Sequence, residues 1–502
     1  MKLRFEPETR RILELVQRIK PEGQAVYLVG GALRDLVLGR PVKDLDFCLG
    51  SGSLELASAV LRELHAAGFT LDDERKTARV ILHQGKPSET LLDFVSFSGD
   101  SLLDDLNHRD FTVNTLSIDL ADLETIIDPL SGQQDLQEGI LRQASAASLE
   151  LDPLRALRGV RMLLDYSLQP DAATAAAMRQ AGSRLGRVSG ERVRDELIKI
   201  LSLPGVAKNI AVLDQYGLLE AACPQIGVLK ELPAIEPHIY SLWQHTLVLL
   251  DYLEAVVNFS LGKPVQSEAY KIDELLSALT PYTEGLKALF SRPIQAGRPR
   301  YLLFYLAGLY HDAGKPASQG SKPDGSPHFY GHPKLGAEMA NGLAEALLLG
   351  REEQDYLVKL VANHMRVHLL AYDGGAISPR AVYRYYKDLG SAGVDVALMS
   401  ICDTLAARGE KLSEQAWRQE LDATLTMLTA WFDQPTQLVR PQKLVTGDDL
   451  MKQFGLPPSR LLGELLEAIR EAQVSGQVQD SAAAYRFAAE YLKEHERNTD
   501  AS

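Results

Sequence analysis

The spacing of apolar residues along the chain changes near residue 145. Before that point, amphipathic patterns predict a helix at about 7–20 and another at 53–67. Four short apolar runs in the same region predict strands: AVYLVGG, DLDFCLG, ARVILH and LLDFVSF. From Asp152 onward strand signals nearly vanish, and leucine and alanine recur at helical spacing almost to the C-terminus. The pattern predicts an α+β head followed by all-α regions.

Breaks in the helical pattern suggest how the chain divides into domains. Proline, glycine and charged residues punctuate it at 202–205, 224–237, 316–327, 373–379 and 433–441. A chain of 502 residues exceeds one hydrophobic core, and about 150 residues per domain predicts roughly three units. We place boundaries near 145, 230 and 415, giving a head (1–145), a helical neck (146–230), a third segment (231–415) and a C-terminal helical tail (416–502). The run at 301–310 is typical of a buried core helix, and 318–327 of an exposed loop.

Composition restricts the class of protein. With 45% hydrophobic and 24% charged residues, the chain is typical of folded globular domains. The N-terminal residues lack the apolar core of a secretory signal, and no run approaches the roughly 20 apolar residues that span a bilayer. Cys48, Cys223 and Cys402 lie far apart, which argues against disulfides and a cysteine zinc site. We expect a cytoplasmic protein with no membrane partner.

The charge of the chain bears on its partners. The net charge is −14, so the chain as a whole repels polyanions, and an RNA partner would need a local basic surface. Residues 155–199 offer such a surface, through Arg155, Arg158, Arg161, Arg179, Arg184, Arg187, Arg192, Arg194 and Lys199. The same residues fit a solvated helical face, and charge alone leaves both interpretations open.

Paired aspartates in the head suggest a metal site. On a strand, the period of two places Asp44 and Asp46 on one face and their apolar neighbours on the other. Two close carboxylates resist ionisation unless a cation compensates, and Mg²⁺ prefers hard oxygen ligands. Asp93, in another apolar strand-like run, is the expected third acid. These residues suit metal-assisted nucleotidyl transfer, although Asp-x-Asp alone is also common in turns and solvated strands.

Residues just before the pair supply groups that bind phosphate. Gly30 and Gly31 lie at a predicted strand-to-helix junction, where bare backbone N–H groups can approach a triphosphate. Arg34 adds a planar cationic fork for phosphate oxygens, and Asp35 follows it. A tight turn without any ligand would explain the glycines equally well.

Six ordered motifs resemble one family. GGALRD, KDLDF, DLNHRDFTVNTLSID, IDPLSGQQDL, DPLRALRGVRML and ERVRDEL are similar to the bacterial tRNA nucleotidyltransferase and poly(A) polymerase family. The resemblance implies a polymerase-beta-like head, with helices and a mixed or antiparallel sheet, followed by a helical neck that contacts RNA. It assigns metal binding to Asp44 and Asp46, and nucleotide contacts to Gly30, Gly31, Arg34, Asp35, Arg109, Asp110, Asn114, Asp152, Arg155, Arg158 and Arg161. Glu191, Arg192 and Glu196 match the element that braces the neck.

In this family Asp152 and Arg155 would read the base of the incoming nucleotide. An aspartate accepts from an exocyclic amine and an arginine donates to ring nitrogen or carbonyl, which can distinguish C or A from U or G. The chain departs from the family pattern at Leu151, where glutamate is usual, at His108, where arginine is usual, and at Lys76-Thr77-Ala78, where Gly-Thr is often seen. These departures put the choice of nucleotide in doubt, but not the metal pair.

A second constellation lies in the helical part. The doublet His311-Asp312 resembles the HD phosphohydrolase superfamily, which implies a divalent metal held by His245, His311, Asp312 and Asp403. His332 and His364 are available for a second metal or a phosphate. Mixed imidazole and carboxylate ligands suit Mn, Fe, Ni, Co or Zn better than Mg. Five other histidines are expected to be surface or satisfied core residues: His65, His83, His238, His328 and His495.

These residues favour one function and leave others open. The leading hypothesis is addition of nucleotides from CTP and ATP to the 3' end of tRNA, or of another RNA, with Mg²⁺ at the head. A poly(A) polymerase, or an enzyme restricted to CC or A addition, would carry the same motifs. A metal-dependent phosphohydrolase with an RNA-binding head is the alternative from another class. The sequence indicates neither the oligomeric state nor whether the HD segment is active.

Overall fold

The computed structural model describes residues 3–42, 44–73, 76–86, 89–236, 238–295, 297–372 and 376–500, with side chains up to residue 495. Lys43 of the KDLDF motif and part of the 373–379 break lie outside these ranges. The chain forms two compact units, Met1–Leu203 with Val212–Ala222 and Pro204–Ala211 with Cys223–Ser502. The finer division at 145, 230 and 415 stays a prediction.

The first unit is built on a six-stranded sheet. Its strands are β1 (Val26–Val29), β2 (Leu45–Leu49), β3 (Ala67–Asp72), β4 (Thr77–Leu82), β5 (Thr90–Ser96) and β6 (Ser117–Asp119), in the order β3-β4-β5-β2-β1-β6. β2 and β5 pair in parallel, and the other neighbours are antiparallel. The mixed sheet confirms the expected fold class of the head.

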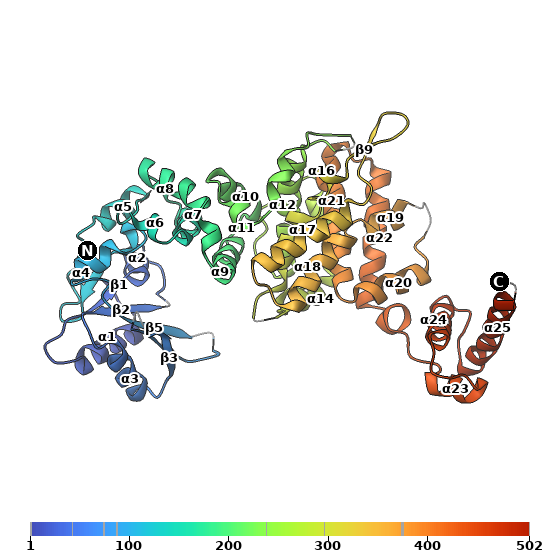
Figure 1. Cartoon of the computed structure of the whole chain (residues 1–502), viewed down its shortest axis with the longest axis horizontal. Coiled ribbons are helices and arrows are strands. Elements are labelled where there is room, and N and C mark those ends of the chain that lie inside the picture. Colours follow the sequence, from blue (N-terminus) through green and yellow to red (C-terminus); the bar gives the residue numbers. More distant parts are fainter. Residues whose placement is uncertain are drawn as a thin grey trace. The chain divides into compact units, whose positions relative to one another are not determined.

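Helices pack on this sheet, and further helices follow it in the sequence. α1 (Pro7–Ile19) packs on α3 (Ser53–Glu63), which packs on β4 and β5, while α2 (Gly31–Val37) packs on β1 and β2 (Figure 1). The rest of the unit is helical apart from the short pair β7 (Ile140–Leu141) and β8 (Gln169–Pro170). Its helices are α4 (Leu102–Asn107), α5 (Gly132–Glu138), α6 (Ser148–Leu151), α7 (Leu154–Tyr166), α8 (Ala172–Gly182), α9 (Gly190–Leu201) and α11 (Leu219–Ala222), and it includes the end of α10 (Val206–Gln215), whose first residues belong to the second unit.

The head differs from the prediction in three places. The helix expected at 53–67 ends at Glu63, and His65 then takes a left-handed φ of 47° that turns the chain into β3. β3 itself was not predicted. Its residues alternate apolar and polar side chains, but it is an edge strand on which Phe69 and Leu71 are exposed. β6 was also missed, since three residues give no readable period.

The second unit is a helical bundle. Its long helices are α12 (Leu242–Ser260), α13 (Ile272–Leu279), α14 (Thr283–Ser291), α15 (Arg300–Tyr310), α17 (His332–Ala346), α18 (Arg351–Asn363), α20 (Pro379–Leu389), α21 (Ala392–Arg408) and α22 (Glu414–Phe432). α12 and α18 each pack on both α15 and α21. As expected for the run at 301–310, nearly every residue of α15 is buried. A buried ion pair between Arg300 and Asp395, joined by the Tyr356 hydroxyl, fastens α15 to α18 and α21.

The remaining elements complete this unit. α16 (Lys315–Ser318) leads into the two-stranded hairpin β9 (Gly320–Ser321) and β10 (Pro327–His328), so the loop expected at 318–327 is exposed but has paired ends. α19 (Arg366–Tyr372) follows α18. α23 (Gly447–Phe454), α24 (Arg460–Val474) and α25 (Ser481–Asp500) share a small core of their own. Among the described residues no single helix is long and apolar enough to cross a membrane; one helix pair passes that test together but is bent by 111°.

Candidate active site and metal centre

Three carboxylates from two neighbouring strands line one cleft in the first unit. Asp46 on β2 is the direct partner of Asp93 on the parallel strand β5. Asp44 lies just before β2 and accepts a hydrogen bond of 3.4 Å from the Leu91 amide. The cleft that all three acids line has a volume of about 1150 Å³. The parallel register therefore brings together acids that lie 47 positions apart in the chain.

The glycine after β1 lets the other groups approach this acid cluster. Gly30 has a left-handed φ of 82°, which a side chain would strain. A Cβ atom there would lie 3.1 Å from Arg109 Nη1 and 3.3 Å from Asp46 Oδ2. Both the positive φ and the close approach of Asp46 and Arg109 therefore require glycine at this position. Gly30, Asp46 and Arg109 lie next to one another in the cleft.

Without a cation, the close and buried carboxylates of this acid cluster disfavour their own ionisation. Burial raises the pKa of Asp46 to about 6, an effect that Arg109 opposes and that Asp93 and Asp44 reinforce. Asp93 is held by Arg79 on β4, whose Nε and Nη2 atoms donate to it at 2.8 Å and 2.7 Å. A divalent cation beside Asp44 and Asp46 would offset the cost, and carboxylate oxygens are the ligands Mg²⁺ prefers. The residues present therefore fit a hard divalent ion.

A buried guanidinium faces the same cleft. Arg34 on α2 is 8% exposed and donates to the Asn114 side chain and, at 3.0 Å, to Asp35. The Tyr166 hydroxyl on α7 accepts from Arg34 and donates to Asp35 at 2.9 Å. The Tyr166 ring lies 4.2 Å from the Cζ atoms of both Arg34 and Arg40. Arg34 is thereby fixed in orientation before any ligand binds.

On the helical side, arginines of α7 line the cleft, each with a partner. Arg158 pairs with the buried Asp110 at 2.8 Å. Burial would raise the pKa of Asp110, but Arg158, the Asn114 amide and a backbone N–H lower it to about 2. Arg161 pairs with Glu196 of α9 at 2.9 Å. These ion pairs attach the helices that follow the sheet to the residues beside the acid cluster.

The two residues expected to read the base also have hydrogen-bond partners within the protein. Arg155 donates to the backbone carbonyls of Arg109 and Ser148 at 3.0 Å and 3.1 Å, and to that of His108 at 2.6 Å. Asp152, which precedes α7, accepts from Arg192 of α9 at 2.7 Å. Both side chains line the cleft, and contact with a base would require at least the exposed Asp152–Arg192 pair to open.

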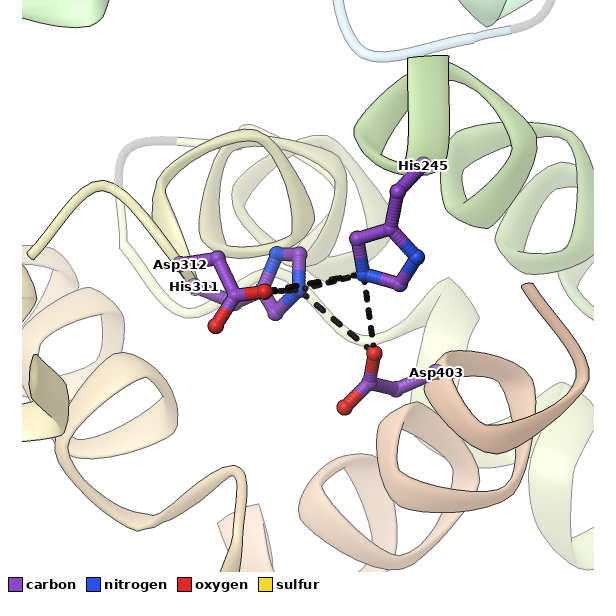
Figure 2. Close-up of side chains that lie close together, drawn as sticks. All are labelled: His245, His311, Asp312 and Asp403. Atoms are coloured by element: carbon purple, nitrogen blue, oxygen red, sulfur yellow. Dashed lines mark hydrogen bonds and ion pairs between the residues drawn. The ribbon is translucent and has the colours of Figure 1, made fainter. Parts of the chain in front are cut away.

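In the second unit, three segments bring two histidines and two aspartates together. His245 comes from α12, His311 and Asp312 from the end of α15, and Asp403 from α21 (Figure 2). His245 Nε2 lies 3.0 Å from Asp403 Oδ1 and 3.2 Å from His311 Nε2, which is 3.2 Å from Asp312 Oδ2. The four candidate ligand atoms lie within 4.8 Å of one another.

A second ligand group shares Asp312 with the first. His332 at the start of α17 and His364 after α18 place their Nε2 atoms 3.3 Å and 3.7 Å from Asp312 Oδ1. These two Nε2 atoms are 3.2 Å apart. Asp312 thus faces one histidine pair with each oxygen, an arrangement that suits two cations bridged by a carboxylate.

The tautomers of these histidines support metal binding. In His311, His332 and His364, Nδ1 lies 2.8 Å from the carbonyl oxygen of the residue three positions earlier. A ring that donates from Nδ1 presents a lone pair at Nε2, and this is the usual outer contact of a metal-bound histidine. Two such Nε2 atoms cannot hydrogen-bond to each other, so a cation between them explains the geometry.

Protonation is another way to account for these close nitrogen and oxygen atoms. Burial would lower the pKa of His311, but Asp312 and Asp403 raise it to about 10. Burial and the neighbouring His311 lower the pKa of His364 to about 3. Without a metal, the His311 imidazolium and the Lys315 ammonium together offset the charge of the two aspartates, and a bound cation would take over the role of the imidazolium and displace its proton.

Comparison with known proteins identifies the family. The model described as "Poly A polymerase head domain" matches residues 26–142, and that described as "HD domain" matches 290–408. A "Probable RNA and SrmB- binding site of polymerase A" matches 167–229. The A-adding tRNA nucleotidyltransferase of Deinococcus radiodurans is 32% identical over 94% of this chain and 96% of its own.

The chain belongs to the tRNA nucleotidyltransferase family. The CC-adding tRNA nucleotidyltransferase of Geobacter sulfurreducens is 28% identical over 93% of this chain and 92% of its own. A solved structure, the Thermotoga maritima CCA-adding enzyme complexed with tRNA_CCA, shares the fold at 20% identity, with a TM-score of 0.59 over 98% of this chain and 99% of that one. The chain is a nucleotidyltransferase whose helical part includes an HD domain.

The residues that sequence reasoning selected for this tRNA nucleotidyltransferase gather in two places. One cleft is lined by Gly30, Gly31, Arg34, Asp35, Asp44, Asp46, Asp93, Arg109, Asp110, Asn114, Asp152, Arg155, Arg158 and Arg161. The other cluster holds His245, His311, Asp312 and Asp403. Their roles in catalysis and binding stay predictions that this arrangement allows.

Sequence reasoning missed several groups at both sites. Arg79 and Tyr166 touch Asp93 and Arg34 through strand and helix packing that no local pattern reveals. Lys315 lies 2.6 Å from Asp312, and its position three residues after the doublet was the available signal. His238 was expected to be surface or core, but its Nε2 lies 3.2 Å from Lys315 Nζ beside the metal cluster. His328 likewise borders a groove at that cluster.

Proposed function

We propose that the head cleft adds nucleotides from CTP or ATP to the 3' end of tRNA. The observation that carries this proposal is the meeting of Asp44, Asp46 and Asp93 with Gly30 and Arg109 in one cleft. The names of the full-length relatives support tRNA as the substrate and C or A as the nucleotide. Mg²⁺ is the proposed ion, because only carboxylates are offered to it.

The proposed step is nucleotidyl transfer. The 3' hydroxyl of the RNA gives up its proton to solvent as its oxygen bonds to the α-phosphorus, the bond from that phosphorus to the bridging oxygen breaks, and pyrophosphate leaves. Ions held by Asp44 and Asp46 would lower the pKa of the attacking hydroxyl and neutralise charge on the triphosphate. Arg34, already fixed by Asn114 and Tyr166, orients phosphate oxygens without further loss of side-chain freedom.

Asp152 and Arg155 are proposed to select the base from their place on the same cleft. A bidentate contact of this kind contributes about 1–3 kcal/mol to discrimination. Leu151, where glutamate is usual, is 63% exposed and offers no acceptor to orient Arg155. The backbone carbonyls that Arg155 contacts are proposed to take over that orienting role.

The test uses tRNAs that end before position 74, 75 or 76, each incubated with Mg²⁺ and one nucleotide at a time. Addition of one or two C residues, of a single A, or of all three identifies the product. Long A-tails on tRNA and on unrelated RNA would refute tRNA-specific addition in favour of poly(A) synthesis. Asp46→Asn, which keeps the shape of the side chain, is expected to lose incorporation on the order of a hundredfold or more.

For the HD domain we propose hydrolysis of phosphate esters with a divalent transition metal. The specific support is the pairing of Nε2 atoms around Asp312. Mixed nitrogen and oxygen ligands favour Mn, Fe, Co, Ni or Zn. A metal there supplies a hydroxide nucleophile. In the reaction, water oxygen bonds to phosphorus, the ester P–O bond breaks and the alcohol leaves with a proton.

Metal content and phosphate release test this second activity. The protein reconstituted with each ion in turn is assayed for bound metal by mass spectrometry and for phosphate released from nucleoside monophosphates and 2',3'-cyclic monophosphates. Asp403→Asn is expected to lose both. Metal-independent phosphate release, or full release by this variant, would refute the proposal.

A further inference from the structure

A groove leads from the metal-ligand cluster of the HD domain to the β9–β10 hairpin. It has a volume of about 320 Å³, within the usual range for small-ligand sites, and both His332 and Asp403 line it. The other charged residues on its wall are Lys315, Lys322 and Arg408. Asp403, a candidate metal ligand, is the sole acid among the described lining residues. The groove therefore favours an anion beside the metal centre.

Lys315 lies at the deep end of the groove. Its Nζ atom is 2.6 Å from Asp312 Oδ2 and 3.2 Å from His238 Nε2, and the side chain is largely buried. An ammonium held next to the shared metal ligand is placed to contact an oxygen of a phosphate bound by the metal. The phosphate end of a ligand is thus defined by Lys315, His238 and the metal cluster.

The hairpin supports an aromatic stack at the other end. His328 on β10 pairs directly with Gly320 on β9, and a Cβ atom at Gly320 would lie 2.5 Å from His328 Cε1. The missing side chain lets the imidazole lie flat on the opposite strand. The Tyr330 ring then stacks on His328, with centroids 4.3 Å apart and planes 22° apart.

Tyr330 is 73% exposed despite being an aromatic residue in a fixed stack. It lines the groove, and only one residue separates it from the candidate ligand His332. Two residues of chain span about 7 Å at most, so the backbones of Tyr330 and His332 are no farther apart than that, and both side chains line the same groove. An exposed ring beside a phosphate site can stack a nucleobase, and such stacking accepts any base.

We propose that Tyr330, supported by His328, is the stacking subsite for the base of a nucleoside phosphate whose phosphate lies at the HD metal cluster. The inference rests on the proposed phosphohydrolase function and narrows its substrate from phosphate esters to nucleotides. The ligand is either a free nucleotide or the 3'-phosphate end of an RNA, which share this chemistry. A phosphate ester without a base has no use for the exposed ring.

The test compares two ligands that differ only by the base. Binding of 5'-AMP and of ribose 5-phosphate is measured by calorimetry on the full chain loaded with Ni²⁺ or Mn²⁺, in an Arg34→Ala/Arg155→Ala background that removes the phosphate and base contacts proposed for the head. Tyr330→Ala is expected to weaken 5'-AMP binding about tenfold and to leave ribose 5-phosphate unchanged. Tyr330→Phe keeps the ring and is expected to bind like the parent.

Controls separate the subsite from general effects and from the hydrolase itself. Tyr301→Ala removes a tyrosine of the same unit, on α15 and outside this groove, and is expected to change neither affinity. Equal affinity of the parent for both ligands, or equal weakening of both by Tyr330→Ala, would overturn the subsite. If no substrate releases phosphate while the base-dependent binding persists, the hydrolase proposal fails and the subsite stands.

A further arm distinguishes the two sources of the ligand. The affinity of 3'-AMP is compared with that of a short RNA ending in a 3'-phosphate. Tighter binding of the RNA, lost in Tyr330→Ala, assigns the site to RNA ends. Tighter binding of 3'-AMP assigns it to free nucleotides. Failure of Tyr330→Ala to weaken either ligand contradicts the proposal.

Discussion

Arg34 illustrates how one side chain is prepared for a phosphate. Its guanidinium is buried, and its acceptors come from Asn114, Asp35 and the Tyr166 hydroxyl. A planar cation held in this way loses little freedom when it binds a triphosphate. The tyrosine belongs to α7, so a helix beyond the sheet determines where a head residue points.

Tyr166→Phe isolates the contribution of that hydroxyl. The ring that lies against Arg34 and Arg40 stays, while the hydrogen bonds to Arg34 and Asp35 are lost. Because hydrogen bonds to charged groups contribute about 1.5–3 kcal/mol, KM for the nucleotide should rise about tenfold, with a smaller change in kcat. Steady-state kinetics of nucleotide incorporation measure the separate effects on KM and kcat. Tyr27→Phe on β1 is the matched control, and an equal effect there would contradict a positioning role.

Asp110 predicts a local dependence of stability on pH. Its folded-state pKa is about 2, below the ordinary value of 3.8, so ionisation stabilises the folded state above about pH 4. That contribution is lost as the pH falls from 4 toward 2. A shift of this size corresponds to about 2 kcal/mol, fully present at neutral pH.

Hydrogen exchange at Phe111–Asn114 is the suitable measurement, because all three tryptophans lie in the second unit and do not report on the first. Wild type should lose protection there between pH 4 and pH 2.5 after correction for intrinsic rates. Asp110→Asn should be less protected at neutral pH, since Arg158 loses its buried partner, and should show a flatter dependence. Parallel curves for the two proteins would contradict this assignment.

Site residues differ in how far the sequence could predict them. Asp44, Asp46 and Gly30 fall in short motifs whose spacing has a local geometric meaning, so they could be selected before any fold was known. Arg79 reaches Asp93 only through the register of β4 against β5, and Tyr166 reaches Arg34 across 132 positions. Register and packing are properties of the assembled fold, which no local period encodes.

The same distinction holds for secondary structure elements. α1, β1, β2, β4 and β5 were predictable because their apolar residues are buried and form the runs or periods typical of a helix or a strand. β3 also alternates apolar and polar residues, but Phe69 and Leu71 are exposed on this edge strand, so its place in the sheet depends on its hydrogen bonds to β4. The hairpin β9–β10 is similar, since only two residues on each side pair.

Gly314 shows how helix contacts support the metal centre. It precedes α16, and a Cβ atom there would lie 2.2 Å from the His332 carbonyl oxygen and 2.7 Å from the Gly336 amide. Both neighbours are backbone atoms of α17 and cannot move aside cheaply. Gly314→Ala should therefore displace His332, lowering the free energy of unfolding by about 1–3 kcal/mol and weakening metal binding.

Gly342→Ala is the matched control on the same helix. Nothing lies within 4 Å of a Cβ atom at Gly342, which is inside α17. Alanine there should stabilise the helix by about 0.5–1 kcal/mol and leave the metal unaffected. Urea unfolding followed by tryptophan fluorescence, together with metal titration, compares the two variants. If Gly314→Ala keeps full metal affinity, the packing of α16 on α17 is not what holds His332.

At the scale of the whole molecule, the two chemistries belong to different compact units. The head cleft and its arginines lie in the first unit, and both histidine groups lie in the second. The ligand types differ as well, with oxygen donors alone in one and mixed nitrogen and oxygen donors in the other. Different ions are therefore expected to fill the two sites in the same solution.

This separation predicts that the two activities are energetically independent. Asp46→Ala should lower incorporation by a hundredfold or more, on the order of the loss of a key electrostatic contact, without changing transition-metal content. Asp312→Ala removes the carboxylate shared by both histidine groups, so it should empty the HD centre and change incorporation less than about twofold. The double variant should then show the product of the two single effects on incorporation. Incorporation rates on trimmed tRNA and metal content by mass spectrometry are measured for the wild type, the two single variants and the double variant. A departure from the product by more than about twofold would mean that the HD metal centre acts on nucleotide addition, and that the two compact units work as one.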